Sequence, residues 1–199
     1  DVCSSDLDWI DESIHQVLMH IKYLCDRRTG LFYHGWTFNE KNNFGGVFWC
    51  RGNSWFTLGI LDYIDMFEGS MNAGLKTFVV DTYKAQTEKL KELQDPKTGL
   101  WHTVLTDPDS YVETSGTAAI AAGILKGIRY GILDDSYLPC AAKAIQGILN
   151  NIDEDGTVLQ VSGGTGMGAN EDHYKNILIA PMAYGQSLTI LALAEALNS

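Results

Sequence analysis

The chain has 199 residues, of which 45% are hydrophobic, enough for one large domain or for part of a bigger one. Its 14 Lys and Arg residues stand against 25 Asp and Glu residues, and the resulting formal net charge of -11 argues against a nucleic-acid partner, because nucleic-acid binding depends on basic surface. No apolar run is long enough to cross a membrane, so no membrane partner is expected, and an anionic ligand would need a local positive site.

The beginning of the chain does not resemble a natural start. Residues 1–7 match the translation of a common sequencing-library adapter, and no initiator Met precedes them. We therefore expect residues 1–7 to be a read-through artefact and the natural coding sequence to enter near Asp8, inside a helix. The alternative is a natural N-terminus with a chance match.

Helical spacing of apolar residues predicts three helices in the first half of the chain. The first, at about 7–26, is amphipathic, and a loop at residues 29–34 (TGLFYH) follows it. The second ends near Gly69 and is apolar on most sides, so it should be buried. The third, at about 71–93, is amphipathic and ends in a turn at residues 94–97.

The loop motif then occurs a second time. Residues 98–102 (TGLWH) echo residues 29–34, and a fourth helix, rich in small apolar residues, is predicted at about 115–130. Small residues allow neighbouring helices to approach closely.

The last part of the chain continues the same order. A fifth, amphipathic helix is predicted at about 136–150 with Ser136 as its cap. A fainter copy of the loop follows at residues 155–159, and a last helix at about 182–197 is apolar nearly all round.

Amphipathic outer helices thus alternate with apolar inner helices, which indicates a helical-hairpin repeat and an all-α fold of the (α/α) toroid type. The predicted helices make up about half of the twelve of a six-hairpin (α/α)6 toroid. We therefore expect exposed apolar flanks on the inner helices and poor behaviour of the chain in isolation.

Residues 48–55 (FWCRGNSW) join one positive charge to two indoles at the entrance of the second helix. Arg51 offers a planar fork that matches a carboxylate, the faces of Trp49 and Trp55 can cover a sugar ring, and the amides of a first helical turn favour an anion. This pattern is what a pocket for an anionic sugar needs. The alternative is that both tryptophans are core residues and Arg51 pairs with an acidic neighbour.

Four ordered motifs resemble the unsaturated rhamnogalacturonyl hydrolases, glycoside hydrolase family 105, which are close to the unsaturated glucuronyl hydrolases of family 88. The motifs are residues 29–36 (TGLFYHGW), 49–55 (WCRGNSW), 99–102 (GLWH) and 109–116 (DSYVETSG). The resemblance runs from about Asp8 to the C-terminus, so residues 8–199 are expected to form the C-terminal part of a single toroid domain.

The resemblance implies action on disaccharides left by pectin lyases, which carry a 4,5-unsaturated galacturonyl group, usually linked to rhamnose. In this family an aspartic acid is thought to protonate the C4=C5 double bond, water adds at C5, and the hemiketal collapses to release the neighbouring sugar. This differs from the ordinary displacement with two carboxylates. The sequence does not identify the leaving sugar.

The substrate-binding residues that the resemblance implies are His34, Trp49, Arg51 and Trp55. His34 matches the family histidine of the sugar site, Trp49 and Arg51 match the contacts to the unsaturated sugar and its carboxylate, and Trp55 matches the second tryptophan of that wall. The catalytic aspartate of the family lies upstream of the position where this chain begins. We therefore expect no catalytic residue within the chain and no turnover from it alone.

Neither a cofactor nor a metal is expected. Residues 163–168 (GGTGMG) resemble a phosphate loop, but no Gly-Lys-Ser/Thr follows and no strand precedes them, so a flexible lid is the favoured interpretation. His15 and His20 are five residues apart, which is not the spacing that places two ligands on one helical face.

Three further residues stay open. His102 and His173 lie in loops that can reach the toroid mouth, and Glu113 precedes the fourth helix as either a capping group or a sugar contact.

Four cysteines, at positions 3, 25, 50 and 140, show neither metal-type spacing nor a small-scaffold disulfide pattern. They favour reduced thiols and a cytoplasmic location. Two alternatives to the enzyme remain: a non-catalytic glycan-binding remnant, and an unrelated (α/α) protein such as a sugar epimerase.

Overall fold

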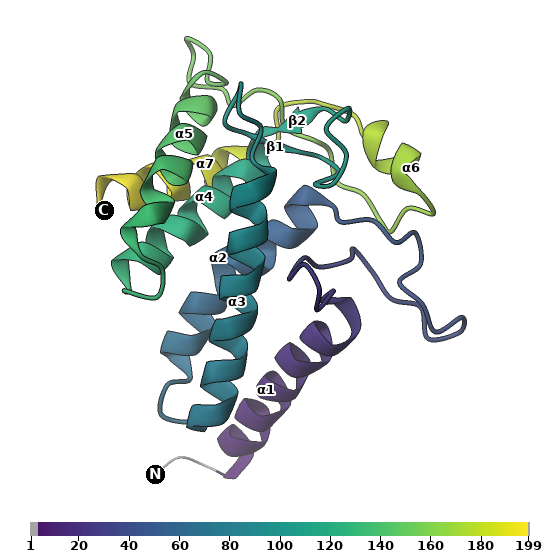
Figure 1. The fold of residues 1–199 in the computed structure, drawn as a ribbon, viewed down its shortest axis with the longest axis vertical. Coiled ribbons are helices and arrows are strands. Elements are labelled where there is room, and N and C mark those ends of the chain that lie inside the picture. The colour runs from purple at the N-terminus through teal and green to yellow at the C-terminus, as the bar shows by residue number, and fades with distance from the viewer. Residues whose placement is uncertain (1–3, 199) are drawn as a thin grey trace.

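The computed structural model describes residues 4–198, with side chains from residue 8. Residues 1–3 of the expected adapter segment therefore lie outside the described residues. Among the described residues, the regular secondary structure is almost entirely helical, and long loops join the helices at one end (Figure 1). Its elements are α1 (Ser4–Leu24), α2 (Cys50–Met66), α3 (Ala73–Leu93), β1 (Trp101–His102), β2 (Val112–Glu113), α4 (Thr114–Arg129), the 3-10 helix η1 (Asp135–Tyr137), α5 (Leu138–Leu149), α6 (Glu171–Lys175) and α7 (Ala183–Leu197).

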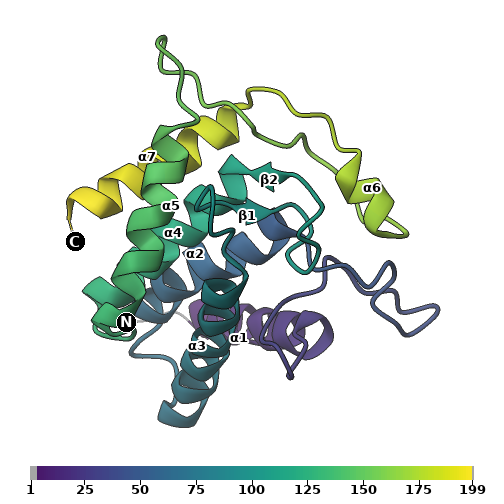
Figure 2. The same ribbon diagram turned by 45° about the horizontal axis from the view of Figure 1, so that its top comes forward.

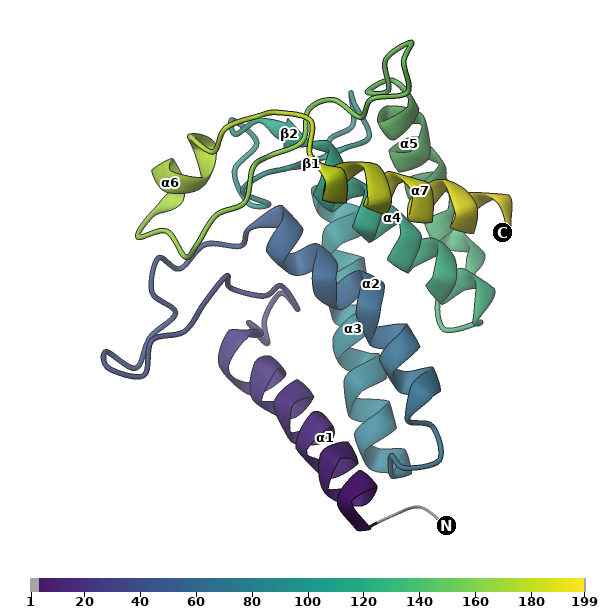
Figure 3. The ribbon, with the colours of Figure 1, turned by 180° about the vertical axis from the view of Figure 1, so that it is seen from behind.

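Helix α4 lies at the centre of the packing. All of its residues from Thr114 to Gly127 are buried, and it packs extensively against α2 on one side and α7 on the other. Seen from behind, α2, α4 and α7 form a layer in front of α3 and α5 (Figure 3). The predicted alternation of inner and outer helices is therefore confirmed for these five helices.

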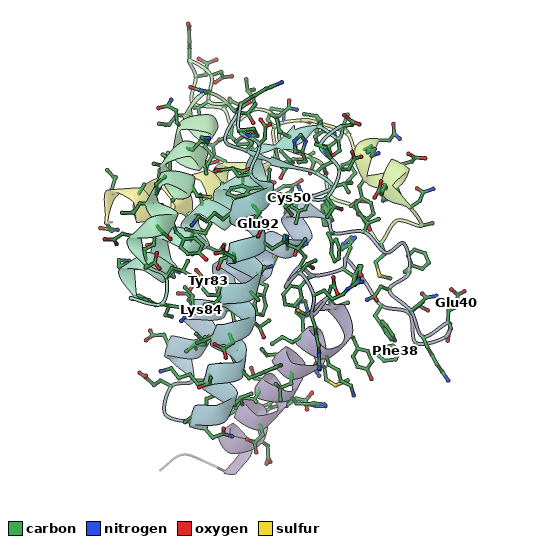
Figure 4. All side chains as sticks on the ribbon, in the orientation of Figure 1. Phe38, Glu40, Cys50, Tyr83, Lys84 and Glu92 are labelled. Atoms are coloured by element: carbon green, nitrogen blue, oxygen red, sulfur yellow. The ribbon has the colours of Figure 1, made fainter. Side chains whose placement is uncertain are left out.

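Close approach of α2 and α4 depends on small residues of α4. A methyl group added at Gly123 would lie 2.4 Å from the carbonyl oxygen of Thr57, and one added at Gly116 would lie 2.6 Å from Sγ of Cys50. Tyr83 of α3, labelled in Figure 4, donates a hydrogen bond of 2.8 Å to the carbonyl of Gly123 and ties the outer layer to the same point. The glycines of α4 therefore set the distance between the inner helices.

Gly123→Ala is expected to lower the free energy of unfolding by about 1–3 kcal/mol, because the added carbon displaces helix backbone and not a flexible side chain. Gly59→Ala on α2 is the matched control, because an added methyl group there meets no atom within 4 Å. That control should raise stability by about 0.5–1 kcal/mol, the difference in helix propensity between Ala and Gly. Urea denaturation of the two variants measures both values, and equal effects would contradict the packing argument.

The repeated loops share one geometry. In the first, Asp26 accepts the backbone N–H of Gly30 and the hydroxyl of Thr29; in the second, Asp95 accepts the equivalent groups of Gly99 and Thr98. The leucine that follows each glycine is fully buried. The Thr-Gly-Leu repeat thus forms a tight turn after each of these outer helices and places its leucine in the core.

Several predicted boundaries need correction. The fifth helix does not begin with a Ser136 cap; instead the Asp134 side chain accepts the N–H of Ser136 at 2.8 Å, and η1 precedes α5. Neither α6 nor the β1–β2 pair was expected, because segments of five and two residues are too short to show periodicity. The second helix begins at Cys50, so Arg51 lies within its first turn.

The inner helices expose apolar side chains, as the half-toroid prediction required. Ile190 and Leu191 of α7 and Trp55 of α2 are between 47% and 59% exposed. Among the described residues, no helix is both long enough and apolar enough to span a membrane.

Candidate substrate site

The site is built around the entrance of α2. Trp49 precedes the helix in an extended conformation, with φ -77° and ψ 130°. The fully buried Asn53 accepts the N–H of Phe32 at 2.7 Å and donates to the carbonyls of Phe32 and Trp49 at 2.8 and 2.9 Å. Asn53 therefore fastens the loop that carries His34 to α2, and the rings of His34 and Trp49 lie 4.5 Å apart.

Arg51 is held almost completely out of solvent, at 3% exposure. Its Nη1 donates to the Ser115 hydroxyl at 3.2 Å and to the carbonyl and hydroxyl of Ser162, each at 2.7 Å. Nη2 donates to the carbonyl of Gly163 at 2.6 Å. The guanidinium carbon lies 4.6 Å from the ring centre of Trp49 and 4.7 Å from that of Tyr184, within the range of cation–π attraction.

Glu113 supplies the opposite charge. Its Oε1 lies 3.8 Å from Nη1 of Arg51, and both side chains are buried. The same carboxylate accepts the N–H groups of Ser115, Gly116 and Ser162 at 3.0, 2.5 and 3.1 Å. Of the two roles considered for Glu113, the structure shows the capping role at the start of α4, together with an ion pair to Arg51.

One edge of Arg51 remains unused within the described residues, where its Nε–H has no hydrogen-bond partner. A guanidinium has five N–H donors, and the bonds to Ser115, Ser162 and Gly163 use the Nη1 hydrogens and one Nη2 hydrogen. In any guanidinium, Nε–H and the Nη2–H on the same side point the same way, at the spacing of a carboxylate's two oxygens. The hydrogen bonds of Nη1 and Nη2 thus fix one side of the fork, while Nε makes none to the described residues.

The loop between residues 162 and 179 closes over this region. Its base is an antiparallel bridge between Ser162 and Ile179, and its helix α6 lies on the same side of the molecule as the 36–47 loop (Figure 2). Tyr174 of α6 is buried in a small apolar cluster with Val47, Trp49 and Val104. We call residues 162–179 the α6 loop.

Burial lowers the pKa of His34, and the nearby charges of His173 and Arg51 lower it further. The ring is therefore neutral at neutral pH. In the unfolded chain, His34 takes up a proton as the pH falls below the ordinary histidine pKa of about 6.5, whereas the folded protein resists this protonation. His34 therefore lowers the free energy of unfolding as the pH falls below that value.

A pocket of about 690 Å³ is formed by the α6 loop together with Met182, and Arg51, Trp49 and His34 are not among its lining residues. Its lining includes Gly163, whose carbonyl accepts from Arg51, and Thr165, Asn170, Asp172 and His173 of the α6 loop. Its volume lies within the range of pockets that hold small ligands.

A family model described as Glycosyl Hydrolase Family 88 matches residues 2–199. The chain belongs to glycosyl hydrolase family 88. Among curated proteins of this kind, the unsaturated rhamnogalacturonyl hydrolase YesR of Bacillus subtilis is 32% identical over 96% of this chain and 54% of its own length. An unsaturated 3S-rhamnoglycuronyl hydrolase of Formosa agariphila is 30% identical over 83% of this chain and 47% of its own length.

Solved structures agree with the family 88 assignment. A protein of Klebsiella pneumoniae described as a possible member of the GH105 family is 42% identical, with a TM-score of 0.92 over 96% of this chain and 50% of that one. The unsaturated glucuronyl hydrolase of Bacillus sp. GL1, at 17% identity and a TM-score of 0.70, shares the fold. The chain thus spans about half the length of the relatives it matches. The resemblance to unsaturated rhamnogalacturonyl hydrolases is confirmed, and an unrelated toroid is excluded.

Within this family 88 chain, the predicted site residues separate into two groups. His34, Trp49 and Arg51 lie together, and Trp49 and Arg51 show the contacts of the alternative interpretation, since Trp49 is buried and Arg51 pairs with Glu113. Trp55, one turn after Arg51, is half exposed and is not a core residue of the described chain. The sugar-binding roles of these residues stay predictions.

The remaining histidines lie apart. His102 contacts the carbonyl of Ser110 at 2.5 Å within the β1–β2 turn, whereas His173 contacts the Thr165 hydroxyl at 2.5 Å and lines the pocket. Sequence analysis missed Ser162 and Tyr174. The glycine run after Ser162 was a usable signal, but nothing in a short polar segment marks Tyr174 as buried.

Proposed function

We propose that this chain forms part of the substrate site of a glycoside hydrolase that acts on a terminal 4,5-unsaturated uronyl residue and releases the neighbouring sugar. The names of its relatives support this activity and a substrate of the unsaturated rhamnogalacturonyl or rhamnoglycuronyl type. The expected ligand is an unsaturated uronyl disaccharide, and we propose a cytoplasmic location, which the free thiols of Cys25, Cys50 and Cys140 support.

The observation that carries the proposal is the fixed, half-used guanidinium of Arg51. A uronyl group has a carboxylate, which the free Nε–Nη2 edge matches, and a ring whose apolar face an indole can cover. The Trp49 ring lies against the face of the guanidinium, and the His34 ring lies against that of Trp49. Because the fork is held by hydrogen bonds before a ligand arrives, little conformational entropy is lost on binding.

Chemically, a proton is added at C4 of the double bond and the oxygen of water at C5, which gives a hemiketal. Opening of the hemiketal breaks the bond between C5 and the ring oxygen and gives a ketone at C5 and a hemiacetal at C1. Collapse of that hemiacetal to an aldehyde breaks the bond to the neighbouring sugar, and the hemiacetal hydroxyl hydrogen ends on the oxygen of the leaving sugar. Arg51 would orient the carboxylate next to the reacting C5. We propose that the aspartic acid that supplies the proton belongs to a part of the protein outside residues 1–199, and that these residues alone have no turnover.

Arg51→Lys is expected to weaken binding of an unsaturated galacturonyl–rhamnose disaccharide by about tenfold or more, because the ammonium keeps the charge but not the fork. Calorimetric titration of the protein expressed from the complete reading frame measures the affinity. Arg28→Lys, at an exposed arginine of the first repeated loop, is the control and should bind as the unchanged protein does. An affinity unaltered by Arg51→Lys, with an unaltered melting curve, would remove Arg51 from the carboxylate site.

The activity itself is tested after sequencing the source DNA across the junction near Asp8. The complete reading frame is expressed and mixed with the unsaturated disaccharide and with its saturated counterpart. We expect loss of the ultraviolet absorbance of the double bond with the first and no reaction with the second. Tight binding without any loss of absorbance would favour the non-catalytic glycan-binding alternative instead.

A further inference from the structure

The hydroxyl of Tyr174 lies between two partners that fix its hydrogen. The backbone N–H of Gly168 donates to Oη of Tyr174 at 2.9 Å. Nδ1 of His34 lies 2.7 Å from the same oxygen. Tyr174 belongs to the α6 loop and His34 to the first repeated loop, 140 residues earlier in the chain, so the contact joins two distant segments at the site.

The donor inventory decides the direction of the second bond. A backbone N–H can only donate, so the Tyr174 oxygen accepts from Gly168. The phenolic hydrogen then needs an acceptor, because the tyrosine is 1% exposed and an unpaired buried donor costs about 1–3 kcal/mol. Nδ1 of His34 is the acceptor within reach, whereas a hydrogen on Nδ1 would leave the phenolic hydrogen without a partner. A neutral histidine that accepts at Nδ1 carries its hydrogen on Nε2.

The position of Tyr174 is itself strongly constrained. Its ring lies 5.9 Å from that of Trp49 and 5.5 Å from that of His34. Its carbonyl accepts from the hydroxyl of Tyr111 at 3.3 Å, and the next residue, Lys175, forms an ion pair with Asp107. The α6 loop therefore cannot move without breaking contacts to the β1–β2 turn and to the wall of the site.

The charged and titratable groups near His34 favour the neutral ring. Arg51 and His173 both disfavour a positive charge there, and burial acts in the same direction. Tyr174 is un-ionised, because burial raises its pKa. A neutral imidazole next to a neutral phenol is thus the arrangement at neutral pH.

We propose that Tyr174 is a positioning residue that holds His34 as the tautomer with its hydrogen on Nε2, so that His34 presents a hydrogen-bond donor to an oxygen of the sugar. The inference rests on the proposed function only for the nature of the ligand; the tautomer follows from the contacts of this chain. In this arrangement the α6 loop, through one hydroxyl, determines what kind of group His34 offers to the substrate.

The tautomer is tested without any ligand. The complete protein is labelled with nitrogen-15 in histidine, and the imidazole nitrogens of His34, assigned from their loss in His34→Gln, are recorded by NMR at neutral pH. We expect an unprotonated Nδ1 and a protonated Nε2. A protonated Nδ1 would overturn the proposal, and this spectrum needs neither a binding measurement nor a folded Tyr174 variant.

Tyr174→Phe keeps the ring in its apolar cluster but removes the hydroxyl. We expect the His34 spectrum to change from one tautomer to a mixture of both, while the spectrum of Tyr184→Phe, which alters a different ring beside Arg51, stays as in the unchanged protein. Refolded Tyr174→Phe with a single Nε2–H tautomer would contradict a positioning role.

Binding of the unsaturated disaccharide separates this proposal from the proposed function. If half of the His34 rings adopt the other tautomer in Tyr174→Phe, the affinity for the disaccharide should fall about twofold. Tyr184→Phe serves only as the control for the NMR spectrum, in which the tautomer of His34 should not change. A protein with the Nε2–H tautomer that neither binds nor cleaves the disaccharide would refute the proposed function and leave the tautomer assignment standing. An affinity unchanged in a Tyr174→Phe protein that shows mixed tautomers would refute the donor role of His34.

Discussion

Glu113→Ala is expected to lower the free energy of unfolding by about 3–5 kcal/mol, because it leaves the buried charge of Arg51 without its counter-ion. The substitution also removes the acceptor for the N–H groups of Ser115, Gly116 and Ser162, and two of these belong to the first turn of α4. Since α4 is the most deeply buried helix and packs on both α2 and α7, fraying of its first turn should affect the whole core.

Urea denaturation followed by circular dichroism measures this change. Glu113→Gln keeps one accepting oxygen. It should lower the free energy of unfolding by less than Glu113→Ala does, but by more than a substitution at an exposed position. Glu92→Ala on the outer helix α3, labelled in Figure 4, is the exposed control; its pair with Lys89 should contribute about 0.5 kcal/mol or less. If the free energy of unfolding of Glu113→Ala is within about 1 kcal/mol of that of the unchanged protein, the buried charge of Arg51 does not need Glu113 as its counter-ion.

The long helices were predictable because they depend on periodicity. Apolar spacing indicated α1, α3 and α5 as amphipathic helices and α2, α4 and α7 as apolar ones, and their bounds in the structure differ from the prediction by a few residues. The start of α5 was wrong because a cap depends on local hydrogen bonding: Asp134 and Ser136 are both good capping residues, and only the geometry shows which of them accepts.

The site was predictable in part, for a different reason. The motif around Arg51 marked the entrance of α2, but nothing in residues 48–55 shows that the guanidinium is bonded to Ser162 and Gly163, more than 100 residues later. Such contacts depend on where the α6 loop returns to the core. The sequence offers pairing of Arg51 with an acidic neighbour as an alternative, but it marks Glu113, the acid that pairs with Arg51, only as a capping group or a sugar contact.

Gly99→Ala is expected to lower the free energy of unfolding by about 3 kcal/mol, from two separate causes. Gly99 has a φ of 76°, a conformation that costs an L-residue about 1–2 kcal/mol. An added methyl group would also lie 2.3 Å from the carbonyl oxygen of Lys143 on α5, and relief of such a clash typically costs about 1–3 kcal/mol. In Gly99→Ala, the loop at residues 98–102 must therefore move away from α5.

Gly156→Ala in the third loop separates the two causes. Gly156 has a φ of 81°, yet an added methyl group there meets no atom of the described residues within 4 Å. It should cost only the backbone term, about 1–2 kcal/mol, and the difference between the two variants measures the contact with α5. If the two variants lose the same free energy of unfolding in urea denaturation, close packing of Gly99 against Lys143 does not contribute to the cost of Gly99→Ala. The effect of Gly99→Ala should also reach the site, because the same loop leads into β1, where Trp101 pairs with Glu113, and displacement of Glu113 would loosen the fork of Arg51.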